Sequence, residues 1–332
     1  MQPAEKAQHI PAIHEVKALA AADMQAVDHL IRDSLKSDVA LVSQVSEYIV
    51  TSGGKRLRPM IVLLAARALG YGGSKHVASA AIIEFIHTAT LLHDDVVDSS
   101  ARRRGRDTAN TVFGNQASVL VGDFLYSRAF QMMVDIGSMQ IMRILADATN
   151  TIAAGEVLQL MNVHDADVTE EAYRQVIYRK TACLFEAGAQ IAAVLAERDA
   201  ADVPAMITFG KNLGTAFQLI DDVLDYDASP SEIGKNLGDD LAEGKPTLPL
   251  IYAMEKGSDA ERKLLRAAIE SDGIGQLDRV QEIVLSTGGL DYTVNCAQSA
   301  VDLAIDAISG IPDSAHKQAL ISLAEFSVRR RS

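Results

Sequence analysis

The chain has 332 residues, of which 48% are hydrophobic and 23% charged, a composition typical of a globular protein with a sizeable core. The net charge of −13 argues against a nucleic-acid binder, because nothing offsets repulsion from phosphates over the whole surface. A phosphorylated ligand would therefore need local cations or metal ions. Cys183 and Cys296 are the only cysteines, so we expect a reducing cytosol and no disulfide framework.

The N-terminal segment and the hydrophobic runs argue against export and membrane insertion. Residues 1–17 lack a basic start followed by an apolar stretch, the pattern of a secretory signal. No run reaches the roughly 18 uninterrupted apolar residues of a membrane span. The best candidate, 76–92, is broken by Glu84 and His87. We therefore expect a soluble, cytoplasmic protein without a membrane span.

Apolar residues recur at helical rather than strand spacing along most of the chain. This spacing predicts helices over 60–69, 76–97, 116–134, 139–161, 170–195 and 205–226. Breaks rich in turn residues fall at 52–54, 70–74, 227–234 and 271–275. Residues 82–92 are apolar nearly all round, which places their helix inside a bundle. We expect one all-α domain over 1–332, with ends that fray before about residue 20 and after about residue 325.

Residues 53–59, Gly-Gly-Lys-Arg-Leu-Arg-Pro, precede the helix predicted at 60–69. Pro59 suits the first helical position, where its missing N–H costs nothing. Lys55 and Arg58 would then lie beside a helix N-terminus, which itself attracts anions. Taken alone, the segment is also compatible with an ordinary loop at the start of a helix.

The sequence His-Asp-Asp-Val-Val-Asp at 93–98 places Asp94 and Asp98 one turn apart on a common helix face, with Asp95 beside them. Three unpaired carboxylates so close would repel one another and raise a pKa, and charge on an apolar helix is costly. Mg²⁺ relieves that cost, because it takes one or two carboxylates together with phosphate oxygens and water. The alternative is an acidic helix end exposed to solvent.

Basic residues follow at once, since 102–106 reads Arg-Arg-Arg-Gly-Arg. A charge reversal so close to three aspartates fits an anion held by metal on one side and guanidinium on the other, although a solvated basic loop is the alternative. A second acidic cluster repeats the first spacing with Asp221, Asp222 and Asp225. Gln218 lies one turn earlier and can present an amide oxygen there. Two copies on apolar helices weaken the solvent-exposed alternative.

Together these residues resemble the trans-isoprenyl diphosphate synthase family, and more narrowly its long-chain polyprenyl members, such as octaprenyl and decaprenyl diphosphate synthases. The resemblance runs in family order across roughly three-fifths of the chain. The matching stretches are GGKRLRP at 53–59, FIHTATLLHDDVVDSSARRRG at 85–105, GEVLQL at 155–160, RKTACLF at 179–185, FQLIDDVLD at 217–225 and GKNLGDDLAEGKPTLPL at 234–250.

The resemblance implies an isoprenoid-synthase-type helical bundle around a deep central cavity, normally in a homodimer. The substrates would be isopentenyl diphosphate and an allylic diphosphate, either farnesyl or geranylgeranyl, and any membrane contact would be peripheral, for product release. The cofactor would be Mg²⁺, with three ions per active site when substrate is bound. Its ligands would be Asp94, Asp95 and Asp98 on one wall, and Asp221, Asp222 and Asp225 on the facing wall.

The resemblance also implies the ligands of the two diphosphates. Arg103 resembles the arginine that grips the allylic diphosphate, whereas Arg104 resembles its neighbour that serves isopentenyl diphosphate. Lys55, Arg58 and His87 match the remaining isopentenyl diphosphate ligands. Since His87 precedes Asp94 by two helical turns, it faces the same cavity. A buried histidine on its own would more often be structural.

Three residues match those around the reacting carbon: Lys180, Thr181 and Gln218. Thr181 in mid-helix can bond back to a carbonyl and bend the helix, which would leave backbone oxygens to face a cation. Second-tier diphosphate ligands are Lys235 and Lys245. For Glu156, Gln159 and Asp123 we expect structural hydrogen bonds.

The implied reaction starts when the diphosphate leaves the allylic carbon, after which the isopentenyl double bond attacks the cation and a proton is lost to the released diphosphate. Short-chain relatives carry bulky aromatic residues four or five positions before the first aspartate, where this chain has Thr90 and Ala89. A growing tail could pass Ala89, about 7.5 Å below the metal site. We therefore expect eight to ten isoprene units, C40–C50, for a quinone side chain.

Other activities remain compatible with parts of this pattern. One alternative is a geranylgeranyl or shorter-chain diphosphate synthase, although short-chain relatives plug the cavity with the aromatic residues that this chain lacks. A class I terpene cyclase would carry an Asn/Ser/Glu metal triad on the second wall, where this chain has aspartates. A regulatory subunit of a two-component synthase usually lacks one acidic cluster, whereas this chain keeps both.

Overall fold

The computed structural model describes residues 11–51, 54, 56–103, 105–198, 201–227, 237–271 and 273–329. The helices of the first half are α1 (Ile13–Ser34), α2 (Ala40–Thr51), α3 (Leu57–Ala68), α4 (Lys75–Val97), α5 (Ala109–Phe113), α6 (Asn115–Ile136) and α7 (Met139–Asn162). Those of the second half are α8 (Glu170–Ile177), the π-helix η1 (Tyr178–Ala182), α9 (Cys183–Leu195), α10 (Asp202–Tyr226), α11 (Asp239–Ala242), α12 (Leu248–Lys256), α13 (Asp259–Ile269), the 3-10 helix η2 (Ile274–Gln276), α14 (Leu277–Ser286), α15 (Gly289–Ala307) and α16 (Ala315–Arg329).

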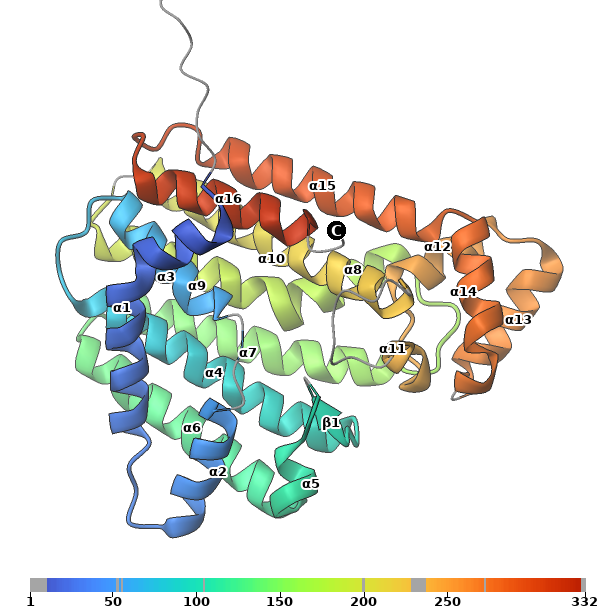
Figure 1. The fold of residues 1–332 in the computed structure, drawn as a ribbon, viewed down its shortest axis with the longest axis horizontal. Helices are drawn as coiled ribbons and strands as arrows, with labels where there is room; N and C mark the ends of the chain where they lie inside the picture. Colours follow the sequence, from blue (N-terminus) through green and yellow to red (C-terminus); the bar gives the residue numbers. More distant parts are fainter. Residues whose placement is uncertain are drawn as a thin grey trace, which may run out of the picture.

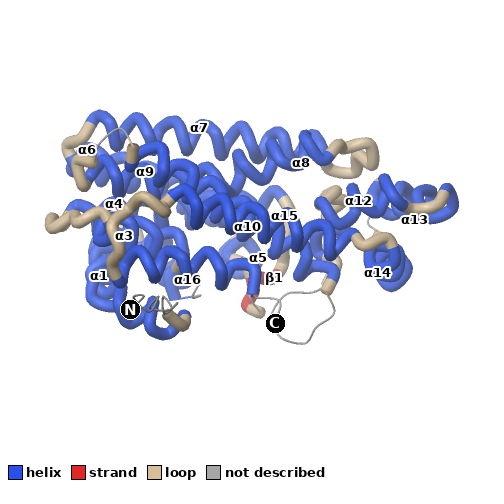
Figure 2. The backbone as a smooth tube through the Cα atoms, turned by 90° about the horizontal axis from the view of Figure 1, so that it is seen from above, coloured by secondary structure: helices blue, strands red, loops and turns tan. Residues whose placement is uncertain are grey.

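The prediction of an all-α fold is confirmed. In the described part of the chain, strands occur only as the antiparallel pair β1 (Arg102–Arg103) and β2 (Arg106–Asp107). The long helices α4, α7, α10 and α15 run in roughly the same direction through the molecule, with α1 at one end and α12, α13 and α14 at the other (Figures 1 and 2). No described helix is long and apolar enough to cross a membrane.

Helix α10 occupies the centre of the bundle, where it packs between α9 and α15. Helix α4 packs against α3 and α6, and its residues Ala80, Ala81, Ile82 and Ile83 are all fully buried. Four consecutive buried residues occupy every side of a helix, so the expectation that this helix lies inside the bundle is confirmed. The polar ends of α4 and α10 are thereby held by apolar helices on both sides.

Three details differ from the sequence-based expectations. The helix expected at 170–195 is divided into α8 and α9 by the π-helix η1. Helix α3 begins at Leu57, so Pro59 is its third residue rather than its first. A proline is tolerated there because the N–H groups of the first helical turn have no partner within the helix. Regular structure also extends beyond the expected limits, from Ile13 to Arg329.

Candidate active site

The C-terminal ends of α4 and α10 face a common cavity of about 800 Å³. Its wall contains both acidic clusters and most of the cations singled out from the sequence. The predicted residues that line it are Arg58, His87, Thr90, Asp94, Asp98, Arg103, Lys180, Thr181, Gln218, Asp221, Asp222, Asp225 and Lys245. Lys55, Arg104 and Lys235 lie outside the described residues, so their roles stay predictions.

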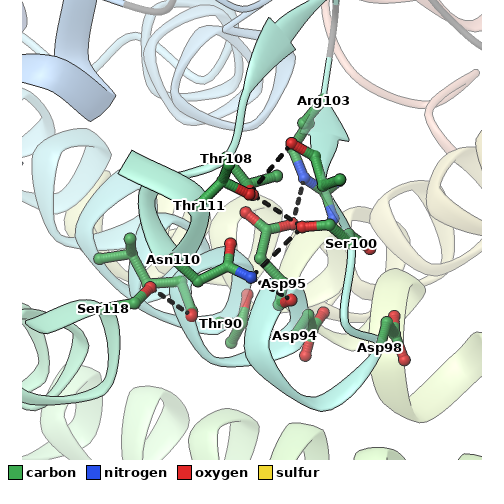
Figure 3. Close-up of polar contacts among 12 residues, drawn as sticks. Thr90, Asp94, Asp95, Asp98, Ser100, Arg103, Thr108, Asn110, Thr111 and Ser118 are labelled. Atoms are coloured by element: carbon green, nitrogen blue, oxygen red, sulfur yellow. Dashed lines mark hydrogen bonds and ion pairs between the residues drawn. The ribbon is translucent and has the colours of Figure 1, made fainter. Parts of the chain in front are cut away.

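The first acidic cluster divides its carboxylates between the cavity and the protein. Asp94 and Asp98 line the cavity, whereas Asp95 is only 2% exposed and accepts a hydrogen bond from Arg103 Nε at 2.8 Å. Figure 3 shows Asp95 turned towards Arg103 and away from its two neighbours. Burial raises the pKa of Asp95, although Arg103 opposes the shift. Asp95 therefore positions Arg103 at the cavity.

The segment that carries Arg103 is tied to the end of α4 by hydrogen bonds from α5 and its N-terminal cap. The Asn110 amide donates to the backbone carbonyl of Asp95 at 3.1 Å. The Thr108 hydroxyl donates to the carbonyl of Ser100 at 2.7 Å (Figure 3). The β1–β2 hairpin is too short to have a hydrophobic core, so these hydrogen bonds hold it at the cavity wall.

Lys245 reaches the first cluster from a segment far away in sequence. Its ammonium lies 2.8 Å from Asp98 Oδ2 and 2.5 Å from Glu243 Oε2. Burial lowers the pKa of Lys245, but the carboxylates of Asp98 and Glu243 outweigh it, so the pKa of Lys245 is raised overall. A permanently charged ammonium at this point can stabilise an anion beside Asp98.

The second acidic cluster is held by neutral donors. Both oxygens of Asp222 are occupied, Oδ2 by the buried Tyr173 hydroxyl and Oδ1 by Gln218 Nε2 at 2.8 Å. Burial, and then Asp240, raise the pKa of Asp222 to about 8. A metal ion would have to compete with both donors for Asp222. Asp225 is 3% exposed and accepts from the backbone N–H of Asp240 at 3.2 Å.

Gln218 and Thr181 form a different hydrogen bond from the expected one. The Thr181 hydroxyl donates to Gln218 Oε1 at 2.8 Å and does not bond back to its own helix. The helix does depart from α geometry at this point, since Thr181 belongs to the π-helix η1, a feature often found at functional sites. The Gln218 amide thus presents its oxygen to Thr181 and its nitrogen to Asp222.

Lys180 projects from the same π-helix towards the first cluster. Its ammonium lies 2.6 Å from Gln159 Oε1, 2.6 Å from Glu156 Oε2 and 3.4 Å from Asp94 Oδ2. Burial, opposed by Lys180, raises the pKa of Glu156 to about 7. Glu156 and Gln159 both line the cavity, whereas Asp123, for which a structural bond was also expected, is 63% exposed at 3.4 Å from His93 Nε2.

Two glycines let neighbouring helices approach the π-helix η1 closely. A Cβ atom at Gly155 of α7 would lie 2.7 Å from Arg179 Cβ, and one at Gly214 of α10 would lie 2.7 Å from Ala182 Cα. Any side chain at either position would push the backbones apart. The π-helix therefore packs tightly between α7 and α10, which holds Lys180 and Thr181 in place between the two clusters.

Arg58 and His87 lie together at another part of the cavity wall, two turns before Asp94 on α4, where Arg58 Nη1 is 3.1 Å from His87 Nε2. The Arg58 guanidinium also lies 4.7 Å from the centroid of the Phe185 ring, a cation–π distance. Arg56, which the sequence analysis did not assign, lines the cavity as well and pairs with Glu84 at 2.5 Å. This part of the wall supplies a second cationic patch.

The carboxylates suit hard divalent cations in chemistry, but they do not form a closed cage. In the described part of the chain, no three His, Cys, Asp or Glu side chains are close enough to hold an ion by themselves. Mg²⁺ normally takes one or two carboxylates and completes its shell with phosphate oxygens and water. The arrangement therefore fits magnesium that is bound jointly with a diphosphate.

Tyr173 and Glu243 were missed as site residues. Tyr173 precedes Asp222 by 49 residues and belongs to no polar motif, so only the folded structure reveals their hydrogen bond. Glu243 lies in the matched stretch 234–250, where its proximity to Lys245 is a signal that could have been used.

Comparison with known proteins agrees with this geometry. The family model "Polyprenyl synthetase" matches residues 39–285. Octaprenyl diphosphate synthase of Escherichia coli is 53% identical, over 96% of this chain and 99% of that protein. All-trans-nonaprenyl-diphosphate synthase of Rhodobacter capsulatus is 46% identical, over 95% and 97% of the two chains.

Solved structures agree with the sequence comparisons. A polyprenyl synthase from Caulobacter crescentus, complexed with calcium and isoprenyl diphosphate, matches with a TM-score of 0.93 and 43% identity over 98% of this chain and 100% of that one. A decaprenyl diphosphate synthase from Rhodobacter capsulatus matches with a TM-score of 0.91 and 44% identity, over 97% and 100% of the two chains. The chain therefore belongs to the polyprenyl synthetase family, as its motifs indicated.

Proposed function

We propose that this prenyltransferase is a long-chain trans-polyprenyl diphosphate synthase, which adds isopentenyl diphosphate repeatedly to an allylic primer, farnesyl or geranylgeranyl diphosphate. The observation that carries the proposal is the single cavity that holds both acidic clusters and the cations around them. The relatives named as octaprenyl, nonaprenyl and decaprenyl synthases support a C40–C50 product. We also propose that the product becomes the side chain of a quinone, and that the enzyme is a single domain located in the cytoplasm.

Mg²⁺ would be held by Asp94 and Asp98 on one wall and by Asp221 and Asp225 on the other, with three ions when substrate is bound. When bound, the metal neutralises the charge of the diphosphate oxygens. Asp95 would act through Arg103, and Asp222 through Gln218 and Tyr173, since protein donors occupy these carboxylates.

The protein's own cations would bind the two diphosphates at separate places. Arg103, Lys180 and Lys245 surround the first acidic cluster and would stabilise the charge that builds on the leaving diphosphate. Arg58 and His87, the latter two helical turns from Asp94, would bind isopentenyl diphosphate. The two diphosphates would thus have separate sets of cations along one cavity.

The cation left on the allylic fragment would face Thr181 and Gln218, which line the cavity and are hydrogen-bonded to each other. Apolar side chains such as Phe217, Val176 and Ile177 line the same cavity and would keep water from the cation. After the new carbon–carbon bond forms, a proton leaves the adjacent carbon for the released diphosphate.

Exposed apolar side chains on α6 and α7 support a homodimer. On α6, Leu120, Phe130 and Val134 fall within one stripe of the helix and are 65%, 43% and 62% exposed. On α7, Leu160 and Met161 are 61% and 73% exposed. A second copy of the chain would bury these residues, because large exposed apolar patches mark association surfaces.

The dimer is tested by Leu120→Asp, which would place a charge in the interface. We expect this variant to sediment as a monomer at concentrations where the native chain is a dimer. Leu303→Asp, on the exposed surface of α15, is the matched control and should leave the mass unchanged. An unaltered dimer in Leu120→Asp would place the interface elsewhere.

The activity is tested by incubating the purified protein with farnesyl diphosphate, labelled isopentenyl diphosphate and Mg²⁺. A ladder of prenyl diphosphates that ends at eight to ten isoprene units, and that chelator abolishes, is the expected result. Products that stop at geranylgeranyl would contradict the chain length. A cyclic hydrocarbon, or no turnover at all, would contradict the activity.

A further inference from the structure

The Lys180 ammonium is fixed by acceptors from other helices. Two of them come from α7, namely Gln159 Oε1 and Glu156 Oε2, each at 2.6 Å, and Asp94 Oδ2 of α4 lies at 3.4 Å. The contact with Gln159 is a hydrogen bond, and the contacts with Glu156 and Asp94 are ion pairs. A lysine side chain otherwise has four rotatable bonds and large rotamer freedom, which this arrangement removes.

The approach of α7 to the π-helix η1 makes these contacts available. Gly155 has no side chain, and its α-carbon lies so close to the π-helix that a Cβ would stand 3.1 Å from the backbone nitrogen of Lys180. Glu156 and Gln159 come next and one turn later, so both reach the same point beside the glycine. The crossing of the two helices therefore determines where the ammonium can be.

The position of Glu156 is hard to explain by stability alone. Its Oε1 is buried and has no hydrogen-bond partner among the described residues, while Oε2 binds Lys180. A buried acceptor without a partner costs free energy. A residue that carries such a cost beside the cavity has a role in the site rather than in the core.

The geometry points to Glu156 and Gln159 as positioning residues, which hold the Lys180 ammonium beside Asp94 so that it meets the leaving diphosphate. This inference rests on the proposed function for the identity of the leaving group. It predicts an effect on kcat rather than on the KM of isopentenyl diphosphate. Among the described residues, the hydrogen-bond and ion-pair partners of Lys180 do not include Arg58 or His87, which would bind that substrate.

The variants that test this role keep the charge of the site. Gln159→Leu removes one acceptor at similar volume, and Glu156→Asp keeps the carboxylate but shortens its reach by one methylene. Each should lower kcat by about 10- to 100-fold, since a misplacement of about 1 Å can cost that much, and leave the KM of isopentenyl diphosphate within about twofold. Gln140→Leu, an exposed glutamine on the same helix, is the matched control and should keep native kinetics.

A double-mutant cycle separates positioning from a general structural role. In the Lys180→Ala background, Gln159→Leu and Glu156→Asp should cause no further loss of kcat, because the group that they position is gone. Equal losses in both backgrounds, or native kcat in the single variants, would overturn the inference. Thermal melting of each variant checks that a loss of activity is not a loss of fold.

A binding measurement decides the same point without turnover. Calorimetry with inorganic diphosphate and Mg²⁺ should show weaker binding for Gln159→Leu than for the native chain, and no difference between Lys180→Ala and the double variant. Equal weakening in both backgrounds would overturn the positioning role. If the native chain makes no prenyl product, the proposed function fails, while this cycle still decides whether Glu156 and Gln159 act through Lys180.

Discussion

The two acidic clusters share one spacing but lie in different electrostatic surroundings. In the first cluster each carboxylate contacts a cation; for example, Arg103 bonds Asp95 and Lys245 bonds Asp98. In the second cluster Asp222 is bound by neutral donors, the Tyr173 hydroxyl and an amide nitrogen. Identical spacing therefore predicts which residues share a helix face, but not how their charge is compensated.

This difference assigns separate tasks to the two walls. The cationic side chains beside the first cluster can exchange their aspartate partners for the oxygens of a diphosphate that approaches Asp94 and Asp98. This wall therefore suits the departure of a negatively charged leaving group. Asp222 is nearly buried, and its pKa of about 8 keeps it largely protonated near neutral pH. The second wall thus provides a hydrogen-bonded support beside the proposed metal ligands Asp221 and Asp225.

Loss of a carboxylate from the first wall should have the largest effect. Asp94→Asn removes a proposed metal ligand and a partner of Lys180, and we expect kcat to fall by about 100- to 1000-fold, as for other groups that stabilise charge in the transition state. Initial rates at saturating Mg²⁺ measure this. Asp147→Asn on the exposed side of α7 is the control. A loss of less than about tenfold would mean that the first wall is not the site of charge separation.

Ala89→Phe sharpens the comparison in a different quantity, the product length. Ala89 is fully buried on α4 and does not itself line the cavity, whereas its neighbour Thr90 does. We expect a phenyl ring at position 89 to intrude on the path of a tail that passes the first cluster. We expect shorter products, which chromatography of the extracted alcohols would reveal. Ala260→Phe on the exposed face of α13 should leave the length unchanged. Products of native length from Ala89→Phe would place the path elsewhere.

Tyr173→Phe tests the support of the second wall. The variant leaves one oxygen of the buried Asp222 without its donor, which should lower the free energy of unfolding by about 1–3 kcal/mol. Urea titration measures the change. Tyr48→Phe also removes a hydroxyl donor, but this hydroxyl bonds an exposed backbone carbonyl at 2.6 Å, so a smaller loss is expected. Equal losses would show that the Asp222 contact has no special cost.

The pH dependence of stability should reflect Asp222 and, with the same sign, Glu156. Their folded-state pKa values of about 8 and about 7 exceed the ordinary carboxyl value, so near neutral pH the folded chain holds protons that the unfolded chain has lost. Raising the pH therefore lowers the free energy of unfolding, by at most about 1.4 kcal/mol per pH unit for each group. The fall begins above the ordinary carboxyl pKa and ends near pH 7 for Glu156 and near pH 8 for Asp222. Urea titrations at several pH values, in chelator, should show a shallower fall for Asp222→Asn. An identical slope would contradict the raised pKa of Asp222.

The sequence predicted the helices, the two acidic clusters and the basic segments, because their periodicity and spacing are local properties. It could not predict that Asp95 and Asp222 turn towards protein donors, since the partners come from other elements. Nor could it predict the division of 170–195, because a π-turn keeps the same apolar residues facing the core as the surrounding helix. For Glu156 and Gln159 the expected hydrogen bonds are present, but their partner, Lys180, is revealed only by the crossing at Gly155.

A π-turn accommodates one residue more than the α-helix around it, so α8 and α9 keep nearly the relative rotation of one continuous helix across η1. Excision of a single residue from 178–182 would let this segment close into an ordinary α-helix, with Tyr173 still facing Asp222. The side chains within the segment would change direction, and Thr181 would lose its alignment with Gln218. A one-residue deletion here would therefore leave both walls in place and disturb only the groups between them.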